Sequence, residues 1–131
     1  MAKTILQSAK VAAPAGIMSQ GVKVPAGKMV FVSGQVARGL DGSVVGVGDA
    51  AAQTRKVLEN MAAVLAESGA TMDDVTKVTV FVTDLKRDFA AIHQVRGEFF
   101  KGEYPASTMV EVSSLVHEDM LVEIEAIAVT H

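Results

Sequence analysis

Alternating apolar and polar residues predict strands in the second half of the chain. Within residues 75–83, Val78, Val80 and Val82 stand at every second position, as in a β-strand with one buried face. Similar patterns over residues 107–112 and 121–129 predict two further strands. We therefore expect a sheet built largely from the C-terminal part of the chain.

An N-terminal hairpin is expected to precede these strands. Residues 29–33 form a short apolar run between two glycines, which indicates a buried strand. We expect residues 16–24 to be its antiparallel partner, with a turn at residues 25–27. The glycine-rich stretch over residues 38–48 then predicts a loop.

Two segments have the apolar spacing of amphipathic helices. Asp49 can cap a helix over residues 49–68, and Gly69 can end it. A second helix is expected over residues 86–101. Its apolar side carries Phe89, Ile92, Val95 and Phe99.

The resulting element order is β-β-α-β-α-β-β within one domain, residues 1–131. A helix between two strands implies a crossover, so we expect an α/β (α+β) fold with a mixed sheet. Both helices should pack on the same face of this sheet.

The two faces of the expected sheet differ in character. The helix-covered face is assigned Val78, Val80, Val82, Val110, Val112, Val122, Ile124 and Ala126. The opposite face is assigned Phe81, Met109, Leu121, Ile127 and Val129, mixed with Ser107, Glu111, Glu123 and Glu125. A solvated face is usually more polar, so we expect this face to meet another subunit and leave a polar pocket. An ordinary half-exposed sheet is the alternative.

Composition narrows the function classes. The chain has 12 basic and 15 acidic residues, no Cys, no Trp and one Tyr, so we do not expect nucleic acid as a partner. We expect no metal site, because there is no Cys and no His pair at ligand spacing. No nucleotide or phosphate-binding motif suggests a cofactor. We see no signal peptide or membrane-spanning run and expect a cytoplasmic protein.

Short segments in a fixed order over nearly the whole chain carry a family resemblance. They are Ser33-Gly34-Gln35, Ala52-Gln53-Thr54 to Asn60, Val78 to Leu85, Asp88-Phe89-Ala90, Tyr104-Pro105-Ala106, Val110-Glu111-Val112 and Glu123 to Val129. Together they make the chain resemble the Rid (reactive intermediate deaminase, or YjgF) family. The resemblance implies a chorismate-mutase-like trimer with small-molecule sites between subunits.

The resemblance also implies an activity, the hydrolysis of reactive enamines and imines. In such family members an Arg after the Pro-Ala pair holds the substrate carboxylate, and a Glu at the position of Glu123 orients the attacking water. This chain keeps the Glu, but Ser107 stands at the Arg position. A hydroxyl cannot replace a guanidinium against a carboxylate, so hydrolysis of small α-imino acids is in doubt.

Other positions depart from the family pattern in ways that change the expected pocket. Met18 replaces a Tyr, Met109 a frequent Cys, His93 a frequent Asn and Arg96 a frequent aromatic residue. Arg96 lies within the apolar arc of its helix and therefore needs a partner. That partner is either a Glu of another subunit or a ligand anion that Ser107 no longer holds.

The candidate catalytic residues are Glu123 and His93, both suited to proton transfer. A paired carboxylate and a structural histidine are the alternatives. Met18, Ser33, Gly34, Arg96, Ser107 and Met109 are the candidate substrate-binding residues. The best-supported function is a cofactor-free hydrolase or deaminase acting on a small imine, enamine or related C=N metabolite. A non-catalytic protein that senses or sequesters a small molecule is the alternative.

Overall fold

The computed structural model describes residues 3–131 and has an α+β architecture. The elements are β1 (Thr4–Leu6), β2 (Gly21–Lys23), β3 (Lys28–Gln35), α1 (Ala50–Ala66), a 3-10 turn (Met72–Asp74), β4 (Val75–Val82), α2 (Leu85–Phe99), β5 (Ala106–Glu111) and β6 (Val122–Thr130).

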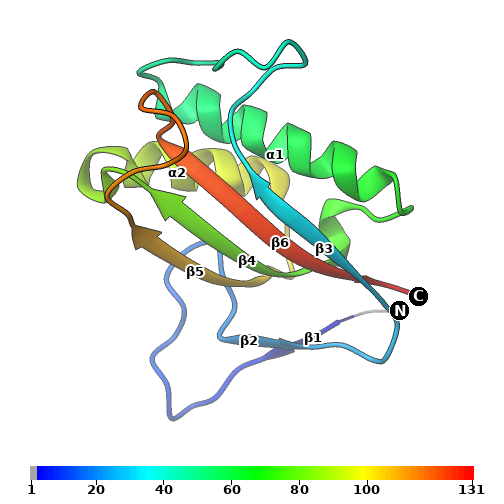
Figure 1. Ribbon diagram of the computed structural model, residues 1–131. Coiled ribbons are helices and arrows are strands. Elements are labelled where there is room, and N and C mark those ends of the chain that lie inside the picture. Colours follow the sequence, from blue (N-terminus) through cyan, green and yellow to red (C-terminus); the bar gives the residue numbers. More distant parts are fainter. Residues whose placement is uncertain (1–2) are drawn as a thin grey trace.

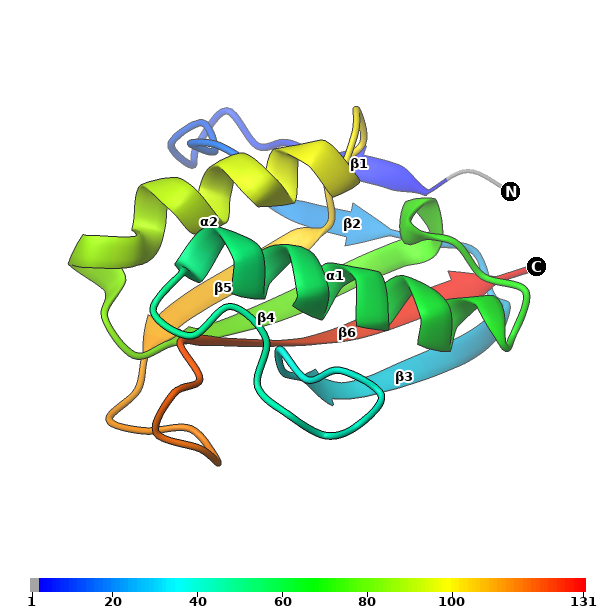
Figure 2. The same cartoon turned by 90° about the horizontal axis from the view of Figure 1, so that it is seen from above.

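A mixed sheet with the strand order β3-β6-β4-β5 forms the centre of the molecule. Strand β4 runs parallel to β5, whereas β6 is antiparallel to both β3 and β4. Helices α1 and α2 lie side by side on one face of this sheet (Figures 1 and 2). The expected fold class, a mixed sheet with both helices on one face, is therefore confirmed.

Local contacts define the starts of both helices, and at α1 they are the ones expected. The Asp49 side chain accepts a hydrogen bond of 3.0 Å from the Ala52 N–H at the start of α1. Gly69, three residues after the helix, has a φ of +76° that few other residues tolerate. At the start of α2, the Asp84 side chain accepts from the Arg87 N–H at 3.1 Å.

The core lies between the helices and the sheet. Strands β4 and β6 bury every second side chain along most of their length, as their sequence patterns predict. The fully or nearly fully buried residues include Val57, Leu58, Met61, Leu65, Val78, Val80, Val82, Ile92, Val95, Val122, Ile124 and Ala126.

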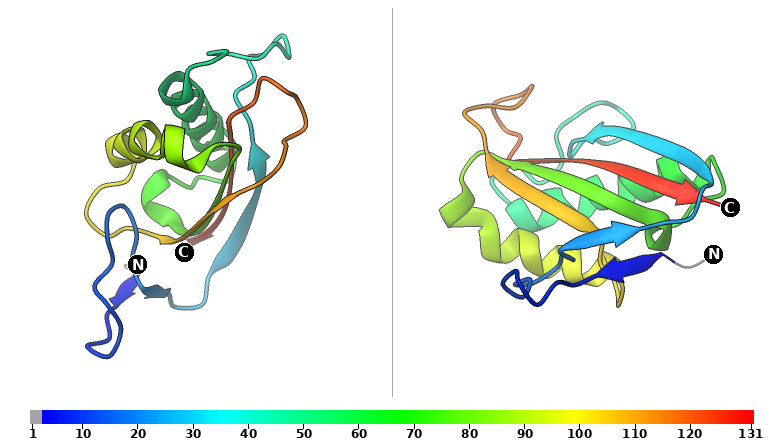
Figure 3. Two further views of the ribbon diagram at one scale, coloured as in Figure 1. Left: turned by 90° about the vertical axis from the view of Figure 1, so that its left-hand side faces the viewer. Right: turned by 90° about the horizontal axis from the view of Figure 1, so that it is seen from below.

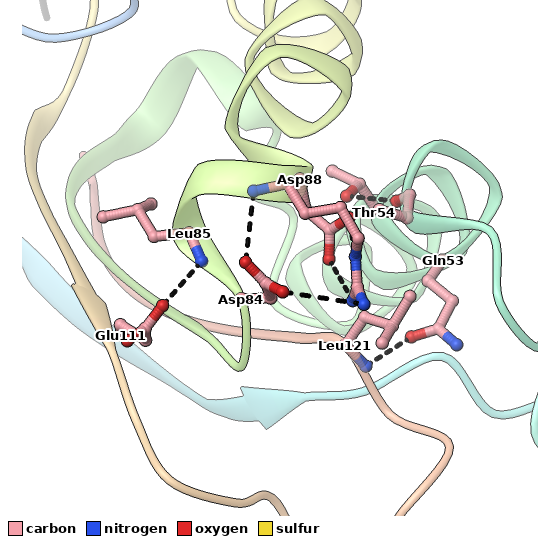
Figure 4. Close-up of polar contacts among 9 residues, drawn as sticks. Gln53, Thr54, Asp84, Leu85, Asp88, Glu111 and Leu121 are labelled. Carbon is pink, nitrogen blue, oxygen red and sulfur yellow. Dashed lines mark hydrogen bonds and ion pairs between the residues drawn. The ribbon is translucent and has the colours of Figure 1, made fainter.

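Polar contacts attach the starts of both helices to neighbouring segments at one end of the sheet (Figure 4). Leu121 donates its N–H to the Gln53 side chain at 2.8 Å, and Leu85 donates its N–H to Glu111 at 2.9 Å. Gln53 also donates to the Asp119 carbonyl at 2.7 Å, so its buried amide is hydrogen-bonded through both the oxygen and the nitrogen.

The predicted N-terminal hairpin is wrong in its pairing. Strand β2 pairs with β1, which the sequence did not reveal, and forms a small separate sheet (Figure 3). Strand β3 instead pairs with β6, the last strand of the chain, which begins at Val122 and is therefore far from β3 in the sequence. The long apolar β6 matches the length of β3, whereas β2 offers only three strand residues.

The face assignment of β5 is also wrong. The parallel register places Met109 beside Val80 and Ser107 beside Val78, on the helix-covered face. Glu111 lies on that face too, and Val110 faces the opposite way and is 39% exposed. Alternation separates the two sides of a strand, but only the register with β4 decides which side meets the helices.

Among residues 3–131, no helix has the length and apolar character needed to span a membrane.

Candidate functional site

Five of the predicted site residues line one recess between α2, β5 and the loop that precedes β2. The recess has a volume of about 90 Å³. Its walls are formed by Ala15, Ile17, Met18, Phe89, His93, Arg96, Ser107 and Met109. The structure therefore brings the helix and strand candidates together on the helix-covered side of β5.

Helical and strand periodicities explain this convergence. His93 and Arg96 are three residues apart on α2, and Phe89 lies one turn earlier, so all three share one side of the helix. The Phe89 and His93 rings stack with centroids 5.3 Å apart. Ser107 and Met109 are two residues apart on β5, so they point to the same face.

Arg96 is buried, with 3% of its surface exposed. One terminal nitrogen, Nη2, donates to the Ile17 carbonyl at 3.1 Å and to the Ser107 hydroxyl at 2.9 Å. The position of Arg96 inside the apolar arc of its helix is as predicted. The salt bridges among residues 3–131 do not include Arg96.

The loop over residues 15–18 is held against β5 by Ser19. This serine is buried, and it bonds through its N–H to the Pro105 carbonyl at 3.1 Å and through its hydroxyl to the Tyr104 carbonyl. Gly16 has a φ of +100°, and a Cβ there would overlap the His93 ring. A residue with a side chain at position 16 would therefore push the loop away from His93.

Glu123, Ser33 and Gly34 form a second group. Between the pairs Val32–Ala126 and Gln35–Ile124, two residues of β3 lie opposite Glu125 alone, which is a β-bulge. At this bulge the Glu123 carboxylate lies directly against Gly34, where a Cβ would overlap it. Glycine is therefore required for this close approach of side chain to backbone.

The two groups lie on opposite faces of the sheet. Glu123 is paired with Phe81 across β4, on the face away from the helices. Ser107 and Met109 lie on the helix-covered face. The predicted residues therefore do not form one site within a single chain, because the sheet separates Glu123 from the recess.

Residues that complete the recess were missed in the sequence. Ala15 and Ile17 belong to a loop whose placement depends on Ser19, and no local pattern marks them. Phe89 was predicted only as part of the apolar side of its helix, although its spacing of four residues from His93 indicates that the two rings can stack.

Comparisons with known proteins agree with the fold and the motifs. The Endoribonuclease L-PSP family model matches residues 9–130. A RutC family protein of Pyrococcus abyssi is 43% identical over 128 residues, covering 98% of each chain. The structure of the Rid-family protein YyfB of Yersinia pestis has a TM-score of 0.92 and 31% identity, covering 99% of this chain and 100% of that chain.

A further solved structure is E. coli TdcF with bound serine, which has a TM-score of 0.72 and 37% identity and covers 98% of each chain. The match to the family model spans nearly the whole chain, and the relatives are similar over their full lengths. The chain therefore belongs to the Rid family.

Proposed function

We propose that this protein is a cofactor-free hydrolase for a small imine, enamine or related C=N compound, with active sites at clefts between subunits. The observation that carries the proposal is the division of the candidate residues between two faces of the sheet. One chain presents the recess and another presents Glu123, so the contact of two copies completes the site.

The face that carries Glu123 has the character of a subunit interface. No other element of residues 3–131 covers it, as the view from below shows (Figure 3, right). Phe31 is 68% exposed there, opposite Ile127, and Val110 lies beside Phe81 at the β5 edge. Large exposed apolar side chains on one face are typical of a protein interaction surface. Membership of the Rid family supports a homotrimer.

The proposed chemistry needs only water and groups that transfer protons. Water adds through its oxygen to the C=N carbon, and a proton goes to the nitrogen. The C–N bond then breaks and releases ammonia and a carbonyl compound. Glu123 accepts a proton from the attacking water, and His93 in the recess is the second candidate for proton transfer.

The size of the recess supports a small ligand. Its volume is only about 90 Å³. The relative TdcF has been solved with bound serine, a small amino acid. The Endoribonuclease description of the family does not lead us to propose RNA cleavage, because the chain has more acidic than basic residues and little aromatic surface for base stacking.

An ammonia-release assay on a panel of imines, with and without a carboxylate beside the C=N carbon, tests the proposal. Catalysed release that depends on Glu123 would support it. Ligand binding in the recess with no turnover of any member would instead favour the alternative, a non-catalytic protein that binds the same class of metabolite.

Replacing Phe31 with glutamate is expected to dissociate the assembly. The native chain should show three times the chain mass of 13.7 kDa in light scattering, and Phe31→Glu should shift the mass towards one chain, because it places a charge on the apolar face. Val64→Glu is the control, since Val64 is also exposed but lies on α1. A native protein with the mass of one chain would rule out the intersubunit site.

Gly34→Ala is expected to lower turnover by about tenfold or more, because displacing a catalytic group by about 1 Å is sufficient for such a loss. The new Cβ would overlap the Glu123 carboxylate, which can move because it ends a flexible side chain. Unfolding free energy should therefore change by only about 1 kcal/mol. Steady-state rates and urea unfolding would measure both effects. Gly42→Ala is a useful comparison, since its Cβ would meet no atom, although its φ of +83° adds strain.

A further inference from the structure

The Arg96 guanidinium is a buried cation without an acidic partner among residues 3–131. Its Nη2 donates hydrogen bonds to the Ile17 carbonyl and the Ser107 hydroxyl. Its Nε is buried and has no hydrogen-bond acceptor among residues 3–131. Burial lowers the pKa of Arg96 to about 10, so the side chain remains protonated at neutral pH. A buried charge with an unsatisfied donor is unfavourable unless something pairs with it.

The same guanidinium forms part of the wall of the recess. Most of the surrounding wall is apolar, with Ile17, Met18, Phe89 and Met109 close to the charge. Water is poorly accommodated by such a lining, and electrostatic attraction is stronger where water is excluded. An anion that enters the recess would therefore meet a single, weakly screened positive charge.

Ser107 adds a second donor at the same place. Its hydroxyl oxygen accepts the hydrogen bond from Arg96, so the single hydroxyl proton is free to be donated to another group. The contact also fixes the orientation of the serine relative to the guanidinium. Together the two side chains present donors and one positive charge, which suit an oxygen anion.

We propose that Arg96, supported by Ser107, is the anion anchor of this recess and that the ligand carries a small carboxylate. The positive charge comes from helix α2, while the strand supplies only a neutral hydroxyl. One cation in a recess of about 90 Å³ matches a singly charged carboxylate. A phosphate dianion would require more positive charge than the described lining supplies. This inference rests on the proposed function only in assigning the carboxylate to the substrate of the same cleft.

An NMR titration with pyruvate tests the inference, with pyruvamide as an uncharged ligand of similar shape. The native protein should bind pyruvate at least tenfold more tightly than pyruvamide. Arg96→Gln should remove this preference. Arg96→Lys should keep part of the preference, because lysine retains the positive charge but lacks the planar guanidinium that binds a carboxylate through two hydrogen bonds. Ser107→Ala should weaken pyruvate binding by a few fold.

Moving the guanidinium to the strand provides a gain-of-binding test. In the double variant Arg96→Gln, Ser107→Arg, the cation enters the recess from β5, next to its original position. Pyruvate binding should recover relative to Arg96→Gln alone. Recovery would show that a guanidinium in this recess holds the carboxylate, and the loss of preference in Arg96→Gln alone assigns that role to Arg96 in the native protein.

Equal binding of pyruvate and pyruvamide by the native protein would overturn the inference. So would an Arg96→Gln variant that keeps the preference. Loss of assembly in Arg96→Gln, together with no preference in the native protein, would show that a carboxylate of another subunit pairs with Arg96.

The outcomes separate this inference from the proposed function. Charge-dependent binding without hydrolysis of any imine would defeat the proposed function and leave the anchor intact. Hydrolysis of uncharged imines at rates independent of Arg96, with no preference for pyruvate, would support the proposed function and rule out the anion anchor.

Discussion

Replacing Glu123 with glutamine is expected to lower turnover by about 100-fold or more, the usual contribution of a proton-transferring group. The substitution keeps the shape of the side chain and removes its charge and basicity. The unfolding free energy of the variant should differ from that of the native protein by only about 1 kcal/mol, because no cavity opens on the face away from the helices. Initial rates of ammonia release and urea unfolding measure the two effects separately.

Glu125→Gln is the matched control for this experiment. Glu125 is two residues further along β6, on the same face, and pairs with Thr79 rather than with Phe81. It does not contact the Gly34 backbone in the way that Glu123 does. We expect little change in its turnover. Full activity of Glu123→Gln would refute the catalytic role, and a dissociated Glu123→Gln would make Glu123 an interface residue.

Elements that depend on local sequence could be predicted well. Asp49 caps α1 through a side-chain contact within three residues, and Gly69 is close to the end of that helix, both as predicted. The alternation in β4 likewise identifies its buried side without knowledge of its neighbours. These features were found because capping and periodicity operate over a few residues.

Features that depend on long-range pairing could not be predicted from these signals. The turn-like residues after β2 suggested a hairpin with β3, but the partner of β3 is β6. The faces of β5 were exchanged for the same reason, because the parallel register with β4 is set by contacts between distant segments. The bulge at Ser33 and Gly34 also arises from pairing and has no sequence signature of its own here.

The candidate site shows both kinds of outcome. The helical arc of α2 correctly placed Arg96 in a buried position, since the arc is a local property. The sequence assigned Ser107 and Glu123 to one face, whereas the structure places them on opposite faces. This correction changes the argument for an intersubunit site. The proposed intersubunit site now rests on the separation of the two groups as well as on the apolar character of the open face.

Ile124→Ala is expected to destabilise the fold by about 2–5 kcal/mol, the usual range for removing a large aliphatic side chain from a core. Ile124 is adjacent to Glu123 in β6 but points to the helices and is 1% exposed. Its neighbour across the sheet is Val80, which is also fully buried. The lost side chain therefore leaves a cavity that rigid neighbours cannot fill.

Ile124→Val gives the graded control, with an expected loss of about 0.5–1.5 kcal/mol for one methylene group. Urea unfolding of both variants should be compared at one protein concentration, because assembly couples stability to concentration. Turnover per folded molecule should stay close to native, since Ile124 faces away from Glu123. A cost below 1 kcal/mol for Ile124→Ala would contradict the close packing of β6 beneath the helices. A large loss of turnover in Ile124→Ala under conditions where the variant is fully folded would show that packing on the helix-covered face of β6 affects Glu123 on the opposite face.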